Sequence, residues 1–255
     1  LKHPMKNPLN SLKIPTKLLF LSLSFSIPIC VLLVLMVKGV NNNIRFARLE
    51  LFGNEYQRPL EQLLDLLPQH QLATSRMALG DKPSASQLAE LEKQVDAAFV
   101  ALETAQSKLG EALQFTPEGL AKRQREHVQT ATVKKEWLEI KAQGATGSAD
   151  GAWEKHLHLI SDLRIMISHV GDMSNLILDP DLDSYYVMDA TLVALPQTQD
   201  RLAAVLGLGE AILKRQSLSK EERGQLSVAA AMLQEADADR IKASLQTALN
   251  EDPNF

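Results

Sequence analysis

An uncharged run of 20 residues, from Leu18 to Val37, constrains the fold of this chain more than any other feature. A helix of that length is about 30 Å long, which matches the hydrocarbon core of a bilayer. Pro28 lies inside the run, and membrane helices tolerate proline better than soluble helices do. A buried helix of a soluble protein rarely needs so many consecutive uncharged residues. The run therefore predicts a transmembrane helix over 18–38.

A cleaved signal peptide is the main alternative, but its apolar region is shorter and ends at small residues. The sequence VKGV at 37–40 offers no such cleavage site. Residues 1–37 contain four lysines and no acidic residue, and cytoplasmic flanks of membrane helices are rich in basic residues. We therefore expect 1–17 in the cytoplasm and 40–255 on the other side of the membrane.

The rest of the chain is acidic and contains no cysteine. Residues 38–255 carry 23 basic and 31 acidic side chains, which argues against nucleic acid as a partner because phosphate binding needs a concentrated basic surface. The one cysteine, Cys30, lies within the apolar run, so a disulfide framework or a cysteine-based metal cage is excluded. The balance of 45% hydrophobic and 23% charged residues is typical of a folded protein.

Beyond the apolar run, the spacing of apolar residues follows the helical period of 3.6 residues, and no convincing alternating strand pattern occurs. We therefore predict an all-α fold, in which one transmembrane helix is followed by an elongated antiparallel helical bundle. The expected helices run over about 49–67, 84–113, 116–143, 153–178, 183–215 and 219–250.

Local signals refine the ends of these helices. Pro59 and Pro68 predict kinks or a segmented rod in the first helix, and Pro196 predicts a kink in the fifth. Thr116, followed by proline, predicts a capped helix start, and an S-x-x-E capping box begins at Ser219. Long helices of this kind can carry a small displacement to the membrane, although a static stalk would show the same periodicity.

The sequence predicts no catalytic machinery, cofactor or metal site. It lacks a P-loop, a nucleophile elbow, a dinucleotide-binding motif and a covalent haem motif. No two of the six histidines form an i,i+4 pair, and His156 and His158 point to different helix faces. A zinc site is therefore not expected, and the chain is not expected to be an enzyme.

A turn with alternating aspartates precedes the fifth helix. Its residues are Asp179, Pro180, Asp181, Leu182 and Asp183. A calcium loop would need glycine and glutamate where Ser184 and Ala190 stand, so we expect a structural turn in which Asp183 or Ser184 caps the helix. In the alternative interpretation these carboxylates, with Tyr185 and Tyr186, line a ligand site or an interface.

Three arginines are the cations to test for capture of a carboxylate ligand, because arginine offers a bidentate fork to such groups. They are Arg58, Arg164 and Arg201. The simpler alternative is that each arginine pairs with a glutamate or aspartate of the chain itself.

Two segments carry a resemblance to a known family. Residues 44–70 follow the apolar run directly, and residues 174–202 contain the aspartate turn and the fifth helix. Both resemble the extracytoplasmic sensing region of bacterial methyl-accepting chemotaxis proteins, a kind of region that also occurs on sensor histidine kinases. The likeness is closest to all-helical sensors that are built from two stacked four-helix bundles.

The resemblance implies a chemoreceptor in a bacterial inner membrane, with residues after about 40 in the periplasm. It implies a homodimer through the first sensor helix, a small organic acid or anion as ligand, and control of a cytoplasmic kinase. The chain ends at Phe255 without the second span and signalling hairpin of such receptors, so we expect a sensor that is incomplete at its C-terminus. The alternatives are the input region of a histidine kinase or diguanylate cyclase, and a single-span anchored stalk.

Overall fold

The computed structural model of the chain describes residues 13–78, 84–143, 149–178 and 181–252. Every regular element within these residues is a helix, which confirms the predicted all-α class. Contacts divide the chain into two compact units, Leu1–Arg48 and Leu49–Phe255.

In the first unit, the described residues form the beginning of helix α1 (Ile14–Ala78). The helix passes Pro28 without a break. Between Leu18 and Val37, each Leu, Ile, Val, Phe and Met side chain is 45–66% exposed. Exposure of so continuous an apolar surface to water is unfavourable, whereas contact with lipid tails is favourable. By its length and a mean hydropathy of 2.7 over its most apolar window, this helix could cross a membrane.

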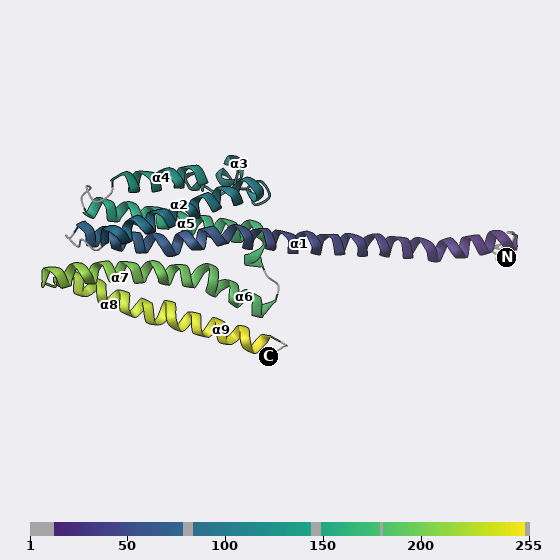
Figure 1. Cartoon of the computed structure of the whole chain (residues 1–255). Helices are drawn as coiled ribbons and strands as arrows, with labels where there is room; N and C mark the ends of the chain where they lie inside the picture. Colours follow the sequence, from purple (N-terminus) through teal and green to yellow (C-terminus); the bar gives the residue numbers. More distant parts are fainter. Residues whose placement is uncertain (1–12, 79–83, 144–148, 179–180, 253–255) are drawn as a thin grey trace. The chain divides into compact units, whose positions relative to one another are not determined.

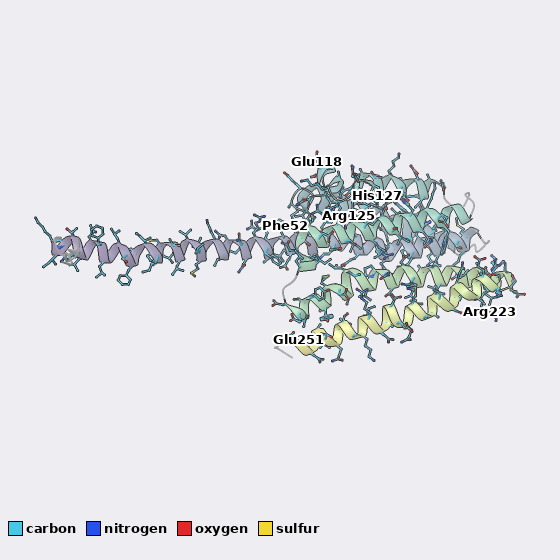
Figure 2. The ribbon with its side chains drawn as sticks, turned by 180° about the vertical axis from the view of Figure 1, so that it is seen from behind. Phe52, Glu118, Arg125, His127, Arg223 and Glu251 are labelled. Carbon is cyan, nitrogen blue, oxygen red and sulfur yellow. The ribbon has the colours of Figure 1, made fainter. Side chains whose placement is uncertain are left out.

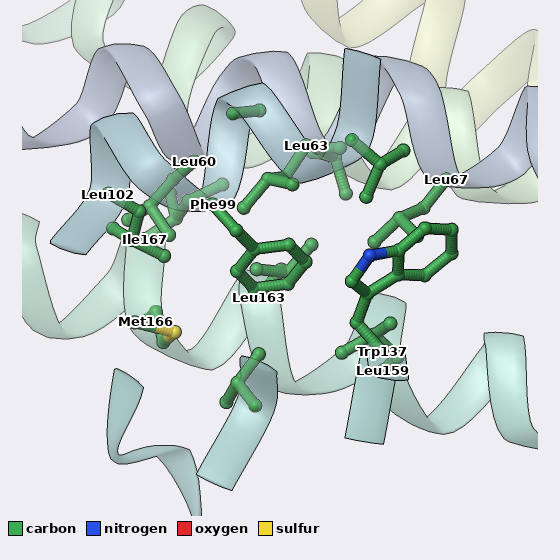
Figure 3. Close-up of a cluster of buried hydrophobic side chains, with 14 of the residues drawn as sticks. Leu60, Leu63, Leu67, Phe99, Leu102, Trp137, Leu159, Leu163, Met166 and Ile167 are labelled. Atoms are coloured by element: carbon green, nitrogen blue, oxygen red, sulfur yellow. The ribbon is translucent and has the colours of Figure 1, made fainter. Parts of the chain in front are cut away.

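The second unit is built around a four-helix bundle. The last part of α1 lies beside α2 (Ser84–Leu109), α4 (Thr130–Gln143) and α5 (Ala149–Ser174) (Figure 1). These helices share one core of buried side chains, and Figure 3 shows its centre. The labelled core residues are Leu60, Leu63, Leu67, Phe99, Leu102, Trp137, Leu159, Leu163, Met166 and Ile167.

Helix α1 is continuous through Pro59 and Pro68, so the predicted segmentation is wrong. Each proline lacks an N–H group and removes one hydrogen bond from the helix. Both prolines are buried in the bundle, where packing on both sides holds the helical path. Tertiary packing supplies most of the stability of a protein helix, so it can outweigh the loss.

The segment 116–143 is not the single helix that the sequence predicts. Thr116 does cap a helix, since its hydroxyl accepts a hydrogen bond from the Gly119 N–H, but this helix, α3, covers only Pro117–Ala121. A short 3₁₀ turn, η2 (Glu126–Val128), and α4 follow. Gln124 adopts a left-handed backbone conformation, with φ 56°, which ends α3 and turns the chain.

The remaining helices form a hairpin. After the 3₁₀ turn η4 (Leu176–Leu178), one leg consists of α6 (Leu182–Met188), η5 (Asp189–Ala194) and α7 (Leu195–Arg215). The other leg consists of α8 (Lys220–Met232), η6 (Leu233–Ala238) and α9 (Asp239–Glu251). Helix α6 packs on α9 and α7 on α8, so the legs are antiparallel. A second stacked four-helix bundle stays a prediction.

Both hairpin legs contain a π-helical segment, η5 or η6. Segment η5 ends at Ala194, two residues before Pro196, the position of the predicted kink. A wider turn here accommodates a residue that cannot donate a hydrogen bond to the preceding turn. The predicted capping box at Ser219 is confirmed. The predicted cap at Asp183 or Ser184 is wrong: Asp181 is the N-cap residue of α6, and the Asp183 carboxylate accepts a hydrogen bond from the Ser184 N–H.

Candidate functional site

A cavity of about 540 Å³ lies between the end of α1, the start of α5, and helices α7 and α8. Its wall is mostly aliphatic and aromatic, with a few polar groups among the apolar ones. The polar contributors are Ser75, Arg201 and Gln225, and the indole of Trp153 forms part of the wall. A mainly apolar pocket between helices with a few polar groups is the usual form of a site for a small organic molecule.

The cavity depends on a close approach between α5 and α7. Gly207 is buried in α7, and a Cβ atom at this position would lie 2.1 Å from Trp153 Cη2. The absence of a side chain at Gly207 therefore lets the indole ring lie directly against the helix backbone. Neighbouring Gly209, by contrast, faces open space.

Arg201 lies at the polar part of the cavity wall and belongs to a buried ion pair. Its Nε atom donates to Asp237 Oδ2 at 2.7 Å, and its Nη1 atom contacts Met232 Sδ at 3.0 Å. Asp237 belongs to η6 and is fully buried, and its Oδ1 atom has no hydrogen-bond partner among the described residues. Because Asp237 balances its charge, Arg201 offers a ligand a hydrogen-bonding edge more than a net positive charge.

The other two candidate arginines lie elsewhere. Arg164 donates to Asp200 Oδ2 at 2.9 Å and lines a cavity of about 240 Å³ beside η5. Arg58 is exposed in a groove whose lining residues all belong to α1. Burial raises the pKa of Glu61 in that groove, and the positive charge of Arg58 opposes the rise. The three arginines therefore lie at three separate sites and do not form one binding site.

The aspartate turn contributes little to the arginine-containing cavity. Asp179 and Pro180 lie outside the described residues. Asp183 lines a different cavity, of about 820 Å³, which also contains Glu61 and Asp252 and is therefore acidic. Tyr185 and Tyr186 pack edge to face, with ring centroids 5.5 Å apart. The acidic cavity would repel an organic anion, so the cavity beside Arg201 is the better candidate.

Comparisons of the chain with family models, curated proteins and solved structures gave no match. The geometry of the candidate site is thus the basis for any proposal about function.

A second polar group lies inside the bundle core, where two histidines meet. His70 Nδ1 of α1 is 2.8 Å from His156 Nε2 of α5, and both side chains are buried. The His70 and Trp137 rings are nearly perpendicular, with centroids 4.8 Å apart, and His70 Nε2 lies 3.9 Å from Glu92 Oε1. Burial lowers the pKa of His70 to about 3, with repulsion from His156 and from Lys141 of α4 adding to the effect.

The buried His70 predicts a loss of stability in mild acid. The folded state keeps the imidazole neutral, whereas the unfolded chain takes up a proton below about pH 6.5. The free energy of unfolding should therefore fall by about 2 kcal/mol between pH 7 and pH 5 on account of this residue. Urea unfolding of the full chain in detergent micelles at a series of pH values would measure the slope. His70→Gln should flatten it; an unchanged slope would assign the effect to other groups.

Sequence reasoning identified Arg201 but missed its surroundings. In the sequence, Trp153 marks only the start of a helix, and Gly207 carries no signal of the ring that lies against it. The residues that complete the cavity wall come from α8, and the apolar spacing of that helix does not tell which other helix they face.

Proposed function

We propose that this chain is the sensing region of a membrane-anchored receptor, and that the cavity beside Arg201 binds its ligand. The observation that supports the proposal most is the combination of this cavity with a helix, α1, that also contains an apolar segment long enough for a membrane. Ser75 of α1 belongs to the cavity wall. A ligand that displaces α1 at this point would act on the helix that carries the anchor.

The wall chemistry indicates the class of ligand. Trp153, Val205, Leu208 and Leu226 favour a hydrocarbon or aromatic body, while Arg201 and Gln225 can hydrogen-bond one polar end. A small organic acid with an apolar body fits this wall better than an inorganic anion, because the Arg201 charge is already balanced by Asp237.

The wider receptor follows from the sequence and not from the cavity. The basic flank before the apolar run supports an N-terminus in the cytoplasm of a bacterium and a periplasmic second unit. In this proposal the receptor is a homodimer, and its output is control of a chemotaxis kinase through a part of the protein that lies beyond residue 255. Its own activity is binding, without catalysis.

Thermal unfolding of the full chain in lipid nanodiscs, against a panel of organic acids, amino acids and nitrate, tests the proposal. A ligand at 100 times its dissociation constant adds about 2.7 kcal/mol of stability, or a rise in Tm of about 5–10 °C for a domain of this size. Ala211→Phe should abolish the rise because Ala211 lines the cavity. Leu213→Phe is the matched control, since Leu213 is exposed on the same helix and is not part of that wall.

Two results would contradict the proposal. One is that no compound of the panel raises Tm. The other is that a compound raises the Tm of the parent chain and of Ala211→Phe equally, which would place binding outside this cavity.

A further inference from the structure

Three potential metal ligands meet where α4 packs on α5. Glu136 of α4 and His158 and Asp162 of α5 each offer a ligand atom, and these atoms all lie within 4.8 Å of one another. His158 Nδ1 is 2.8 Å from Glu136 Oε1 and 4.0 Å from Asp162 Oδ2. His158 and Asp162 are four residues apart and therefore share one face of α5.

A second imidazole lies next to this group. His127 Nε2 is 3.8 Å from Oδ1 of Asp162, the carboxylate oxygen that His158 does not face. His127 belongs to η2, the short turn just before α4, and Figure 2 labels it there. His127 is thus a neighbour of Asp162, while the ligand atoms that lie within 4.8 Å of one another are those of Glu136, His158 and Asp162.

Asp162 is the residue that most needs a cation. Its side chain is only 5% exposed, and its two carboxylate oxygens contact His127 at 3.8 Å and His158 at 4.0 Å. Its nearest polar neighbours are the two imidazole nitrogens, which are beyond hydrogen-bond distance. Burial removes water from this carboxylate, and a bound metal ion would compensate for the lost hydration more strongly than these long imidazole contacts do.

We propose that Glu136, His158 and Asp162 bind a divalent transition-metal ion, with Zn²⁺ the expected occupant and water as its fourth ligand. Tetrahedral zinc with bonds of about 2.0–2.1 Å places its ligand atoms about 3.3 Å apart. The observed separations of 2.8 and 4.0 Å lie on either side of that value, and His158, which is exposed, is free to turn its ring. Nitrogen and carboxylate ligands without thiolate suit Zn²⁺ better than Ca²⁺ or Mg²⁺.

This site is independent of the proposed sensing function and differs from the expectation of the sequence, which predicted no metal site. The alternative is an ion-free group in which Glu136 and His158 are a simple ion pair. That alternative explains the 2.8 Å contact but leaves the buried Asp162 carboxylate with only the long contacts to His127 and His158.

Zinc titration of the full chain in detergent micelles distinguishes the two. The protein is first stripped with EDTA and dialysed, and Zn²⁺ binding is then measured by competition with a chromogenic chelator. We expect one ion per chain at this site, with Mg²⁺ unable to compete. His158→Ala and Asp162→Asn should each weaken zinc binding at least about tenfold. Even the loss of a residue that only orients a metal ligand usually weakens binding by about that factor.

Glu103→Gln is the matched control. Glu103 belongs to α2, and its carboxylate pairs with Lys134 of α4 and not with an imidazole. The substitution should leave zinc affinity unchanged. Binding of Co²⁺ should give the visible absorption of a tetrahedral site in the parent chain and in Glu103→Gln, and lose it in His158→Ala. Absence of stoichiometric Zn²⁺ binding, or binding that survives both ligand substitutions, would overturn the proposal.

Discussion

Replacing Trp137 with alanine should lower the free energy of unfolding by about 3–5 kcal/mol, the usual cost of truncating a fully buried aromatic side chain. Trp137 is completely buried, lies 6.5 Å from the Phe99 ring centroid, and donates its indole N–H to Asp96 at 2.8 Å. The substitution would therefore leave a cavity at the centre of the four-helix bundle and remove a hydrogen bond from Asp96. Urea unfolding of the full chain in micelles, followed by circular dichroism, measures the loss.

Leu138→Ala is the matched control for this prediction. Leu138 is the next residue of α4 but is 49% exposed, so its truncation should cost less than about 1 kcal/mol. Trp137→Phe should fall between the two, because the phenyl ring refills much of the space without restoring the hydrogen bond. Equal losses for Trp137→Ala and Leu138→Ala would mean that the bundle core does not control the stability of this unit.

Arg201→Met should cost about 3–5 kcal/mol, because it leaves the fully buried Asp237 carboxylate without its cation. The methionine side chain keeps much of the apolar contact, so the loss reports mainly on charge. Arg164→Met is the control: its partner Asp200 is partly exposed, and such pairs contribute about 0–1 kcal/mol. Both variants are compared by the same urea experiment.

A double substitution separates a lost contact from an uncompensated charge. In Arg201→Met/Asp237→Leu neither charge remains, so most of the stability that Arg201→Met loses should return. If the double variant is as unstable as Arg201→Met alone, or if Arg164→Met is as damaging, the Arg201–Asp237 pair does not have the energetic role that its burial indicates.

The helical class and most of the core could be predicted because burial on a helix is a local, periodic property. Each core-facing apolar residue belongs to a helical repeat within its own helix, and such residues are buried; examples are Leu60 and Leu63 of α1, Phe99 of α2 and Leu163 of α5. The capping box at Ser219 is equally local, since both of its hydrogen bonds join residues three positions apart. Such features need no knowledge of the partner helix.

The breaks and the candidate sites could not be predicted in the same way. The left-handed Gln124, which ends α3, is a glutamine where glycine would have been the usual signal. Three of the important contacts join residues of different helices: Trp153 with Gly207, Asp237 with Arg201, and Glu136 with His158. Apolar spacing tells which face of a helix is buried but not which residues of another helix meet it.

The two π segments have a consequence for how the length of this hairpin can vary. A residue added to an α-helix rotates everything after it by about 100°, which would turn an apolar stripe away from its partner. A π turn absorbs one additional residue locally. Each leg of the hairpin has one such turn, in η5 or in η6. Each leg therefore has the form of an α-helix with one extra residue, whose rotation does not extend to the residues that follow. The extra residue of η5 or η6 therefore leaves the apolar faces on either side of it in register.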